Sequence, residues 1–242
     1  MHTRSHDGSA IGVYIVSIVT IVTTVEAVLL LVCVAEPDMG GDGPVDESKR
    51  ATLRRFAALG AAGPLARFSD SDGDSESDAR EAIAGYVSTT PGAHFSKIRD
   101  DLQLGTGESQ HHLRQLAEDG RIDSYRDGDY RRFFAAGQFS EREMVVLSYL
   151  RRETPRGMLV ALLRDPSATG GDLAATLNVS RPTVSKYASE LESVGLLSRD
   201  DGYAVEEPET VLTLLVRYAD SFGEHAATLA TEAADLVSYD PE

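Results

Sequence analysis

Between residues 79 and 205, apolar side chains recur every three or four positions in a series of short segments. This is the spacing of helices that bury one face, and the helices it predicts are 79–88, 95–102, 107–119, 140–152, 155–164, 172–177 and 181–194. Two other segments, 121–135 and 196–205, contain an Asp-Gly pair, which favours a tight β-hairpin turn. Helices followed by a hairpin occur twice, so we expect two winged helix-turn-helix units.

The helix predicted at 181–194 has two chemically different faces. Ser180 is its expected N-cap, and Gly195 is expected to end it. At 100° per residue the apolar side chains gather on one face, which we predict to be buried: Val184, Tyr187, Ala188, Leu191 and Val194. The outward face gathers small, polar and basic residues: Arg181, Pro182, Thr183, Ser185, Lys186, Ser189 and Ser193. Because the first half of this face carries no carboxylate, it is suited to a DNA groove.

The helix predicted at 107–119 is a weaker candidate for reading DNA. Ser109, Leu113, Leu116 and Ala117 share its expected core face. His111, Arg114 and Gln115 point outward, but so do Glu108 and Glu118, and carboxylates repel DNA phosphates. The hairpin at 121–135 is the better candidate in this unit, because a wing is well placed to contact phosphate or a minor groove; its candidate side chains are Tyr130, Arg131 and Arg132.

A long C-terminal helix is predicted at 209–237. Apolar residues stand at positions 211, 215, 218, 222, 226, 229, 233 and 236, the spacing of a coiled-coil seam. We interpret this as a dimerisation helix, which readers of palindromic sites need; the alternative is a helix that folds back onto its own domain.

A membrane span is predicted at 11–35, after a ten-residue tail at 1–10. The span has 25 residues, of which 15 are Val, Ile or Leu and only Glu26 is charged, and it is long enough for a bilayer core of about 30 Å. Arg and Lys are more frequent after the span than before it, so the C-terminal domains are expected in the cytoplasm. A cleaved signal peptide, and hence an exported protein, is an alternative, because Cys33-Val34-Ala35 loosely resembles a cleavage site.

Residues 36–78 are predicted to be a flexible acidic linker. Residues 36–48 are rich in Gly, Pro and acidic side chains, and 69–78 (SDSDGDSESD) is acidic low-complexity sequence. Within the linker, 49–68 fits either a loose spacer or a short basic amphipathic helix, with Leu53, Phe56 and Leu59 toward lipid.

The formal charge is −16, with 3 Lys, 20 Arg and 39 acidic residues. Few lysines and many carboxylates are typical of proteins from halophilic archaea. At about 1 M salt the Debye length is only about 3 Å, so distant carboxylates scarcely repel DNA. The overall charge therefore does not exclude DNA binding.

No catalytic, cofactor or metal motif is found. Gly105-Thr106-Gly107 lacks the lysine and spacing of a phosphate loop, and the adjacent His111 and His112 diverge on a helix. The single cysteine, Cys33, excludes an intrachain disulfide and a thiolate-rich zinc site. We therefore expect no enzyme and no cofactor.

The stretch TTPGAHFSKIRDDLQLGTGESQHHLRQLAEDGRIDSYRDGDYRRFF resembles the amino-terminal module of archaeal, and specifically haloarchaeal, predicted regulators with two helix-turn-helix domains, often linked to a membrane segment. The stretch LNVSRPTVSKYASELESVGLLSRDDGY is similar to MarR- and TrmB-like winged-helix regulators. The resemblance implies that Ser180, Arg181, Thr183, Ser185 and Lys186 contact bases and phosphates. His111 and Arg114 occupy the corresponding positions of the recognition helix in the first module. Ser189, Arg199 and Gln115 complete the candidate DNA contacts.

The predicted fold class is mainly α with small β-hairpins. It comprises an N-terminal transmembrane helix, tandem winged helix-turn-helix domains at 79–137 and 138–205, with a connecting helix opening the second, and a long C-terminal helix within 206–242. The predicted function is a membrane-anchored DNA-binding transcriptional regulator, held in the cell membrane by a single pass at 11–35. Its partners would be double-stranded DNA and a second copy of the chain. The alternative is a membrane-tethered protein-interaction adaptor, which would expose apolar residues on the outward helix face.

Overall fold

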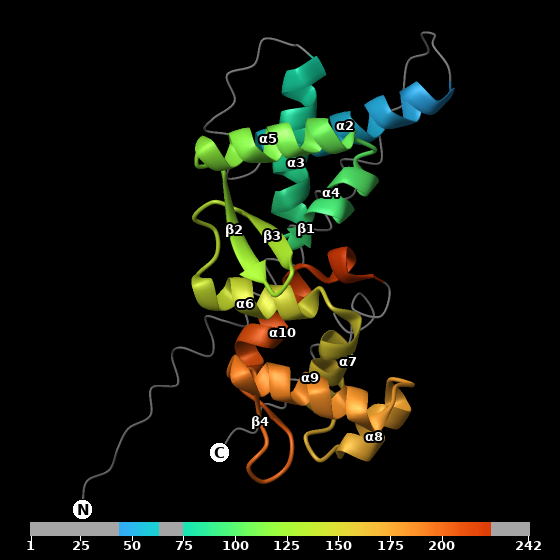
Figure 1. Cartoon of the computed structure of the whole chain (residues 1–242), viewed down its shortest axis with the longest axis vertical. Coiled ribbons are helices and arrows are strands. Elements are labelled where there is room, and N and C mark those ends of the chain that lie inside the picture. The colour runs from blue at the N-terminus through green and yellow to red at the C-terminus, as the bar shows by residue number, and fades with distance from the viewer. Residues whose placement is uncertain (1–43, 63–74, 224–242) are drawn as a thin grey trace, which may run out of the picture. The chain divides into compact units, whose positions relative to one another are not determined.

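The structure is a computed structural model, and it describes residues 44–62 and 75–223 (Figure 1). The predicted span at 11–35, with its signal-peptide alternative, lies outside these residues, as do most of the acidic low-complexity segment and the last part of the predicted C-terminal helix. In the two described ranges, no helix is both long and apolar enough to cross a bilayer.

The first unit contains α3 (Ser75–Thr89), β1 (Ala93–His94), α4 (Phe95–Asp101), α5 (Thr106–Glu118), β2 (Ile122–Asp127) and β3 (Tyr130–Ala135). Its strands pair antiparallel in the order β1-β3-β2, and Asp127 lies opposite Tyr130 at the hairpin turn. Gly128 in that turn has φ +59°, a conformation that glycine adopts without strain. The hairpin and the three helices predicted for this unit are confirmed, although α3 begins earlier than expected.

The core of the first unit forms where α3, α4 and α5 meet the sheet. It includes Ile83, Val87, Ile98, Leu102, Leu113, Leu116 and Phe133. A buried ion pair fixes α3 to the start of β2, because Arg121 donates to both carboxylate oxygens of Glu81 at 2.5 and 2.7 Å. Two parallel hydrogen bonds of this kind hold both groups in a defined orientation.

Helix α2 (Pro44–Ala62) packs against α3, inside the segment that was expected to be a linker. Leu53 and Phe56 contact the core of the first unit, and the Phe56 ring lies 5.1 Å from the Tyr86 ring. The linker prediction for 36–78 and the placement of these apolar side chains in lipid are therefore wrong for α2. The amphipathic face was read correctly, but it is covered by a protein surface.

The second unit contains α6 (Glu141–Leu150), α7 (Glu153–Arg164), α8 (Gly170–Thr176), α9 (Arg181–Ser193), β4 (Leu197–Ser198), β5 (Ala204–Val205) and α10 (Pro208–Arg217). Local sequence explains where the helices begin. Ser140 and Glu143 form a capping box, and the Ser180 hydroxyl accepts a hydrogen bond from the Thr183 amide at 3.2 Å. Gly195, with φ +67°, follows α9 as predicted.

The two units share strand β3, whose neighbouring residues belong to different cores. Phe133 lies in the core of the first unit, whereas Phe134 lies in the core of the second, with Phe139, Leu147 and Leu150. Successive strand residues point to opposite faces, so one strand serves both cores. Figure 1 shows α6 beside the β2–β3 hairpin, and the two elements are in contact. Helix α6, which connects the two units, therefore packs them together.

The predicted continuous helix at 209–237 is wrong in the described part. Helix α10 ends at Arg217 and is followed by a short 3-10 helix, η2 (Ala219–Phe222), and by Gly223 with φ +96°. The first four positions of the predicted seam are buried in the core of the second unit: Val211, Leu215, Tyr218 and Phe222. The Tyr218 ring lies 5.8 Å from Phe139. In this part the alternative holds, because the apolar stripe folds back onto its own domain.

Candidate nucleic-acid interface

Helix α9 presents the two faces that its sequence predicts. Val184, Ala188 and Leu191 are almost completely buried. Arg181, Pro182, Ser185, Lys186 and Ser189 are exposed, and the Lys186 side chain keeps 69% of its surface accessible. The outward face is therefore a strip of hydroxyl groups and cations anchored by an apolar inner face.

Short-range contacts fix the amino-terminal end of α9. Asn178, in the turn between α8 and α9, has φ +52°, a left-handed conformation that Asn tolerates better than most residues. The Ser180 and Thr183 hydroxyls lie 2.8 Å apart, so Thr183 turns toward the cap and is only partly exposed. The first turns of a recognition helix are its base-reading end, and here the contacts between Ser180 and Thr183 cap the first turn.

Arg142 from α6 holds the other end of α9. Its guanidinium donates to the carbonyl oxygens of Val194 at 2.6 Å and Gly195 at 2.5 Å, and it also contacts Glu207 at 2.9 Å. A cation at the last carbonyls of a helix satisfies them and complements the helix dipole. Nothing in the local sequence pattern of α6 pointed to this role, because the contact spans more than fifty residues.

Arg199, a predicted DNA contact on the second hairpin, is exposed but paired with Glu192 of α9. Its Nε donates to the Glu192 carboxylate at 2.8 Å, and a hydrogen bond and ion pair through Nη2 reinforce the contact. The hydrogen bond to Glu192 raises the pKa of Arg199 above its ordinary value. Binding of Arg199 to phosphate would require this guanidinium to leave Glu192.

In the first unit, the candidate side chains of α5 lie on a mixed surface. Arg114 is exposed, His111 and Gln115 are partly exposed, and Arg114 Nη2 lies 3.4 Å from His111 Nδ1. Arg114 is also within 4.0 Å of the Glu118 carboxylate. Lys49 from α2 approaches Glu108 at 3.8 Å. The two carboxylates expected on this face are therefore present and engaged with cations.

The first hairpin places its three candidate residues differently. Tyr130 and Arg131 are exposed, and Arg131 Nε donates to the Ser124 hydroxyl at 3.0 Å. Arg132 is only 4% exposed and donates to Asp127 at 2.6 Å and to the Gly92 carbonyl at 3.1 Å. The expected position of Arg132 on an open wing is therefore wrong. Residues 131 and 132 point to opposite faces of β3, and the face of Arg132 packs against the second unit.

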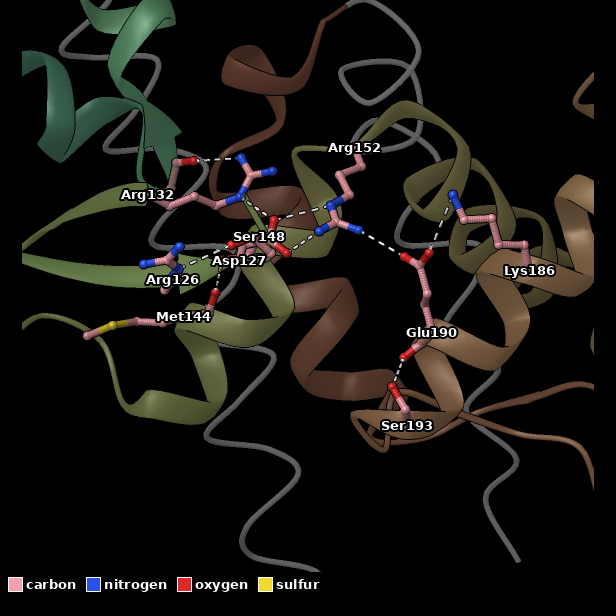
Figure 2. Close-up of polar contacts among 11 residues, drawn as sticks. Arg126, Asp127, Arg132, Met144, Ser148, Arg152, Lys186, Glu190 and Ser193 are labelled. Atoms are coloured by element: carbon pink, nitrogen blue, oxygen red, sulfur yellow. Dashed lines mark hydrogen bonds and ion pairs between the residues drawn. The ribbon is translucent and has the colours of Figure 1, made fainter. Parts of the chain in front are cut away.

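A chain of ion pairs links the first hairpin to α9 (Figure 2). Arg152 contacts Asp127 at 3.1 Å through Nε and donates to Glu190 Oε2 at 3.0 Å through Nη1. The other Glu190 oxygen lies 3.8 Å from the Lys186 ammonium group. Burial lowers the pKa of Arg152, but Asp127 and Glu190 more than compensate and raise it above its ordinary value. Lys186 thus shares the Glu190 carboxylate with a partly buried guanidinium.

The sequence pattern gave no sign that Arg152 is the partner of Glu190. Arg152 and Asp127 stand 38 and 63 positions earlier in the chain. The Asp-Gly turn signal identified Asp127 as a turn residue, and no periodic pattern distinguished Arg152 from the other arginines. Only the docking of the first hairpin on α6 brings these groups together.

Comparisons with known proteins agree with this division into two units. A family model described as an N-terminal HTH domain matches residues 77–147, and a model described as winged helix-turn-helix DNA-binding matches residues 151–198. An uncharacterised HTH-type transcriptional regulator of Methanocaldococcus jannaschii is 28% identical over 126 residues, which are 52% of this chain. The match spans about a third of that relative, 32% of its length. No solved structure matches the chain significantly.

The two family matches fall on the two units that the structure shows. The first extends into α6, whose apolar side chains complete the core of the second unit, and the second covers α7 to β4. The chain therefore contains two helix-turn-helix domains in tandem, the second of which is a winged helix-turn-helix.

Proposed function

We propose that this chain is a DNA-binding transcriptional regulator and that α9 is its principal reading element. The observation that carries the proposal is the outward face of α9, where Arg181, Ser185, Lys186 and Ser189 are exposed. A helix of this kind fits the major groove of B-DNA, where Arg and Lys recognise guanine and hydroxyl groups contact bases or phosphates. The relative from Methanocaldococcus jannaschii, which carries the words transcriptional regulator in its name, supports the same function.

The individual residues have distinct proposed roles. Arg181, Ser185 and Ser189 would contact base edges, while Ser180 and Thr183 orient the first turn and donate to phosphate. Lys186 would bind a phosphate or a guanine at the edge of the face. Arg199 would also contact DNA, because its guanidinium would leave Glu192 and bind a phosphate.

The first domain would contribute phosphate contacts from its exposed cations. Tyr130 and Arg131 on the hairpin are the best placed, with Arg114, His111 and Gln115 on α5 as weaker contacts because of the nearby carboxylates. Phosphate contacts carry little sequence information but fix the register of the protein on the duplex. Arg132 is excluded from this set because it is buried in an ion pair.

An adaptor that binds proteins would need an apolar outward face on α9, and the described face is polar. Tyr130 is the one large hydrophobic side chain that is exposed in the described ranges, and it lies on the first hairpin. A polar, cationic face favours nucleic acid over a protein partner.

We also propose, from the sequence alone, that residues 11–35 anchor the chain in the cell membrane with the helix-turn-helix domains in the cytoplasm. Fractionation of cells expressing the chain tests this proposal. Extraction from the membrane fraction by detergent, and not by high salt or alkaline carbonate, is the expected result. Release by salt or carbonate alone would contradict it.

A homodimer is the remaining proposal, because winged-helix readers of palindromic sites act as pairs. The side chains at positions 211, 215, 218 and 222 are buried in the core of the second domain. The proposed dimer seam is therefore restricted to the apolar positions 226, 229, 233 and 236. Light scattering on chains ending at residue 223 and at residue 242 tests this, with a dimer expected only for the longer chain.

Selection of bound duplexes from a random-sequence pool tests the central proposal. We expect a defined sequence to be enriched and to bind at least about a thousandfold more tightly than a scrambled duplex, which is the lower end for specific regulators. Equal binding to the enriched and scrambled duplexes would overturn the proposal.

A further inference from the structure

Helix α9 turns directly into the second hairpin at residues 194–196, which we call the α9–β4 corner. Gly195 has φ +67°, and strand β4 begins at Leu197. Arg199, a proposed phosphate contact, follows this strand. Because the corner is so short, its conformation sets the angle between the proposed reading helix and the hairpin that carries Arg199.

Contacts from outside the corner fix its backbone. Arg142, in the first turn of α6, donates to the Val194 carbonyl oxygen at 2.6 Å and to the Gly195 carbonyl oxygen at 2.5 Å. The Glu206 amide, beyond the second hairpin, donates to the Leu196 carbonyl oxygen at 3.1 Å. Each carbonyl oxygen of the corner therefore accepts a hydrogen bond from another part of the chain.

Glu207 joins these contacts into a closed circuit. Its carboxylate accepts a hydrogen bond from Arg142 Nε at 2.9 Å, and it directly follows Glu206 in the chain. The circuit runs from α6 to the corner, from the corner to residues 206 and 207, and back to α6. A guanidinium presents its donors in a fixed planar fork, so Arg142 binds one carboxylate and two carbonyls in a defined geometry.

The backbone of Glu207 is an outlier that local sequence does not favour. Its φ and ψ are both +52°, a left-handed conformation that is costly for a residue with a Cβ. Pro208 follows, and a residue before proline is pushed toward extended backbone. The Glu207 side chain keeps 47% of its surface accessible, so it gains the contact with Arg142 here rather than burial. Such an outlier persists only where tertiary contacts hold it.

We propose that Arg142 and Glu207 are positioning residues for DNA binding, which fix the angle between α9 and the second hairpin. This inference rests on the proposed function, in which α9 enters a major groove and Arg199 binds phosphate. Both residues act through the corner and not by contact with DNA. A looser corner still allows phosphate contacts but misaligns the side chains that read base edges, so sequence specificity falls before general affinity.

The ratio of the affinities for the enriched and the scrambled duplex, measured on the full chain by fluorescence anisotropy, tests this role. We expect Arg142→Gln and Glu207→Gly each to lower the ratio about tenfold, which is the discrimination that roughly one base pair provides. Partial unfolding reduces the active protein equally for both duplexes, so it would not change the ratio. An unchanged ratio in both folded variants would overturn the proposal.

Glu207→Gly separates positioning from stability. Glycine adopts a left-handed backbone without the cost of a Cβ, and an exposed ion pair contributes little, so the midpoint of denaturant unfolding should be unchanged or higher. A merely structural role predicts that so stable a variant keeps its full specificity. Gln103→Gly is the matched control, because Gln103 is exposed, has φ +56° and lies in the first unit; it should leave the ratio unchanged. If Arg142→Gln does not fold, Glu207→Gly decides the question.

Amide hydrogen exchange of the full chain without DNA separates this inference from the proposed function. In both variants we expect exchange to become about tenfold faster at residues 194–206 and to stay unchanged at 75–135. Unchanged exchange at 194–206 would overturn the inference whether or not the chain binds DNA. Faster exchange there, together with no duplex binding by the unaltered chain, would reject the proposed function and leave the contacts that fix the corner standing.

Discussion

Arg152 and Glu190 are joined by a hydrogen bond of 3.0 Å that runs from the helix–helix junction after α6 to the side of α9. Arg152 also binds Asp127 at the tip of the first hairpin, so one guanidinium connects the two domains. Glu190 lies one helical turn after Lys186 and is its nearest carboxylate, at 3.8 Å. The charge available on the proposed DNA-reading face is therefore set partly by a residue outside α9.

Replacing Lys186 by Glu should abolish specific DNA binding while leaving the fold intact. The side chain is exposed, so the main cost to stability is repulsion from Glu190 one turn away, about 0.5 kcal/mol. Fluorescence anisotropy with the selected duplex measures the affinity, and Arg217→Glu on α10 is the matched control. An unchanged affinity of the Lys186→Glu protein would reject α9 as the reader.

Replacing Arg152 by Gln should weaken DNA binding and lower the free energy of unfolding by about 1–3 kcal/mol, because Asp127 is buried and loses a charged partner. Glu190 would then pair only with Lys186. Addition of Glu190→Gln should restore much of the DNA affinity but not the stability lost at Asp127. A double-mutant cycle with Arg152→Gln and Glu190→Gln measures the coupling between these two residues in DNA affinity. Additive effects on DNA affinity would contradict the proposed link between Glu190 and Lys186.

Acidification should destabilise the first domain through His94. Burial, followed by the charges of Arg132 and Lys97, lowers the pKa of His94 below its ordinary value near 6.5, against smaller opposing effects of Asp100 and Asp101. The unfolded chain therefore takes up the proton first, so the free energy of unfolding falls as pH decreases through 6.5 and levels off below the folded pKa.

This loss includes the loss of the cap, because protonation removes the hydrogen bond by which His94 Nδ1 caps α4 at Lys97. Denaturant unfolding at pH 7.5 and at lower pH values measures it. His94→Asn, which keeps a capping side chain without a titrating group, should remove this part of the pH dependence. An equal pH dependence in both proteins would contradict the assignment to His94.

Replacing Phe222 by Ala should lower the free energy of unfolding by about 3 kcal/mol or more, since this ring is 7% exposed and packs in the core of the second domain. Tyr130→Ala, which removes an aromatic ring that is 54% exposed, should cost less than about 1 kcal/mol. Denaturant unfolding at two protein concentrations measures both. A loss that appears only at low concentration would instead place Phe222 in a dimer interface.

The sequence by itself determined the local structure of both domains. The Ser180 cap, the Asp-Gly hairpin and the buried face of α9 were all predicted, because they depend on residues within about one helical turn or across one hairpin. The outward face of α9, which carries the proposed function, was predicted for the same reason. Helical periodicity alone decides which side chains of α9 point away from the core.

Only the tertiary structure decided what covers each apolar or charged face. The amphipathic pattern of α2 is the same whether Phe56 meets lipid or Tyr86, and the apolar stripe that includes Tyr218 and Phe222 fits a partner helix as well as the core it enters. Arg132 was assigned to an open wing because it lies in the predicted hairpin, but the second domain covers its side of the strand. The Asp127–Arg152–Glu190 contacts join residues far apart in the chain, and a periodic pattern holds no information about pairs at that distance.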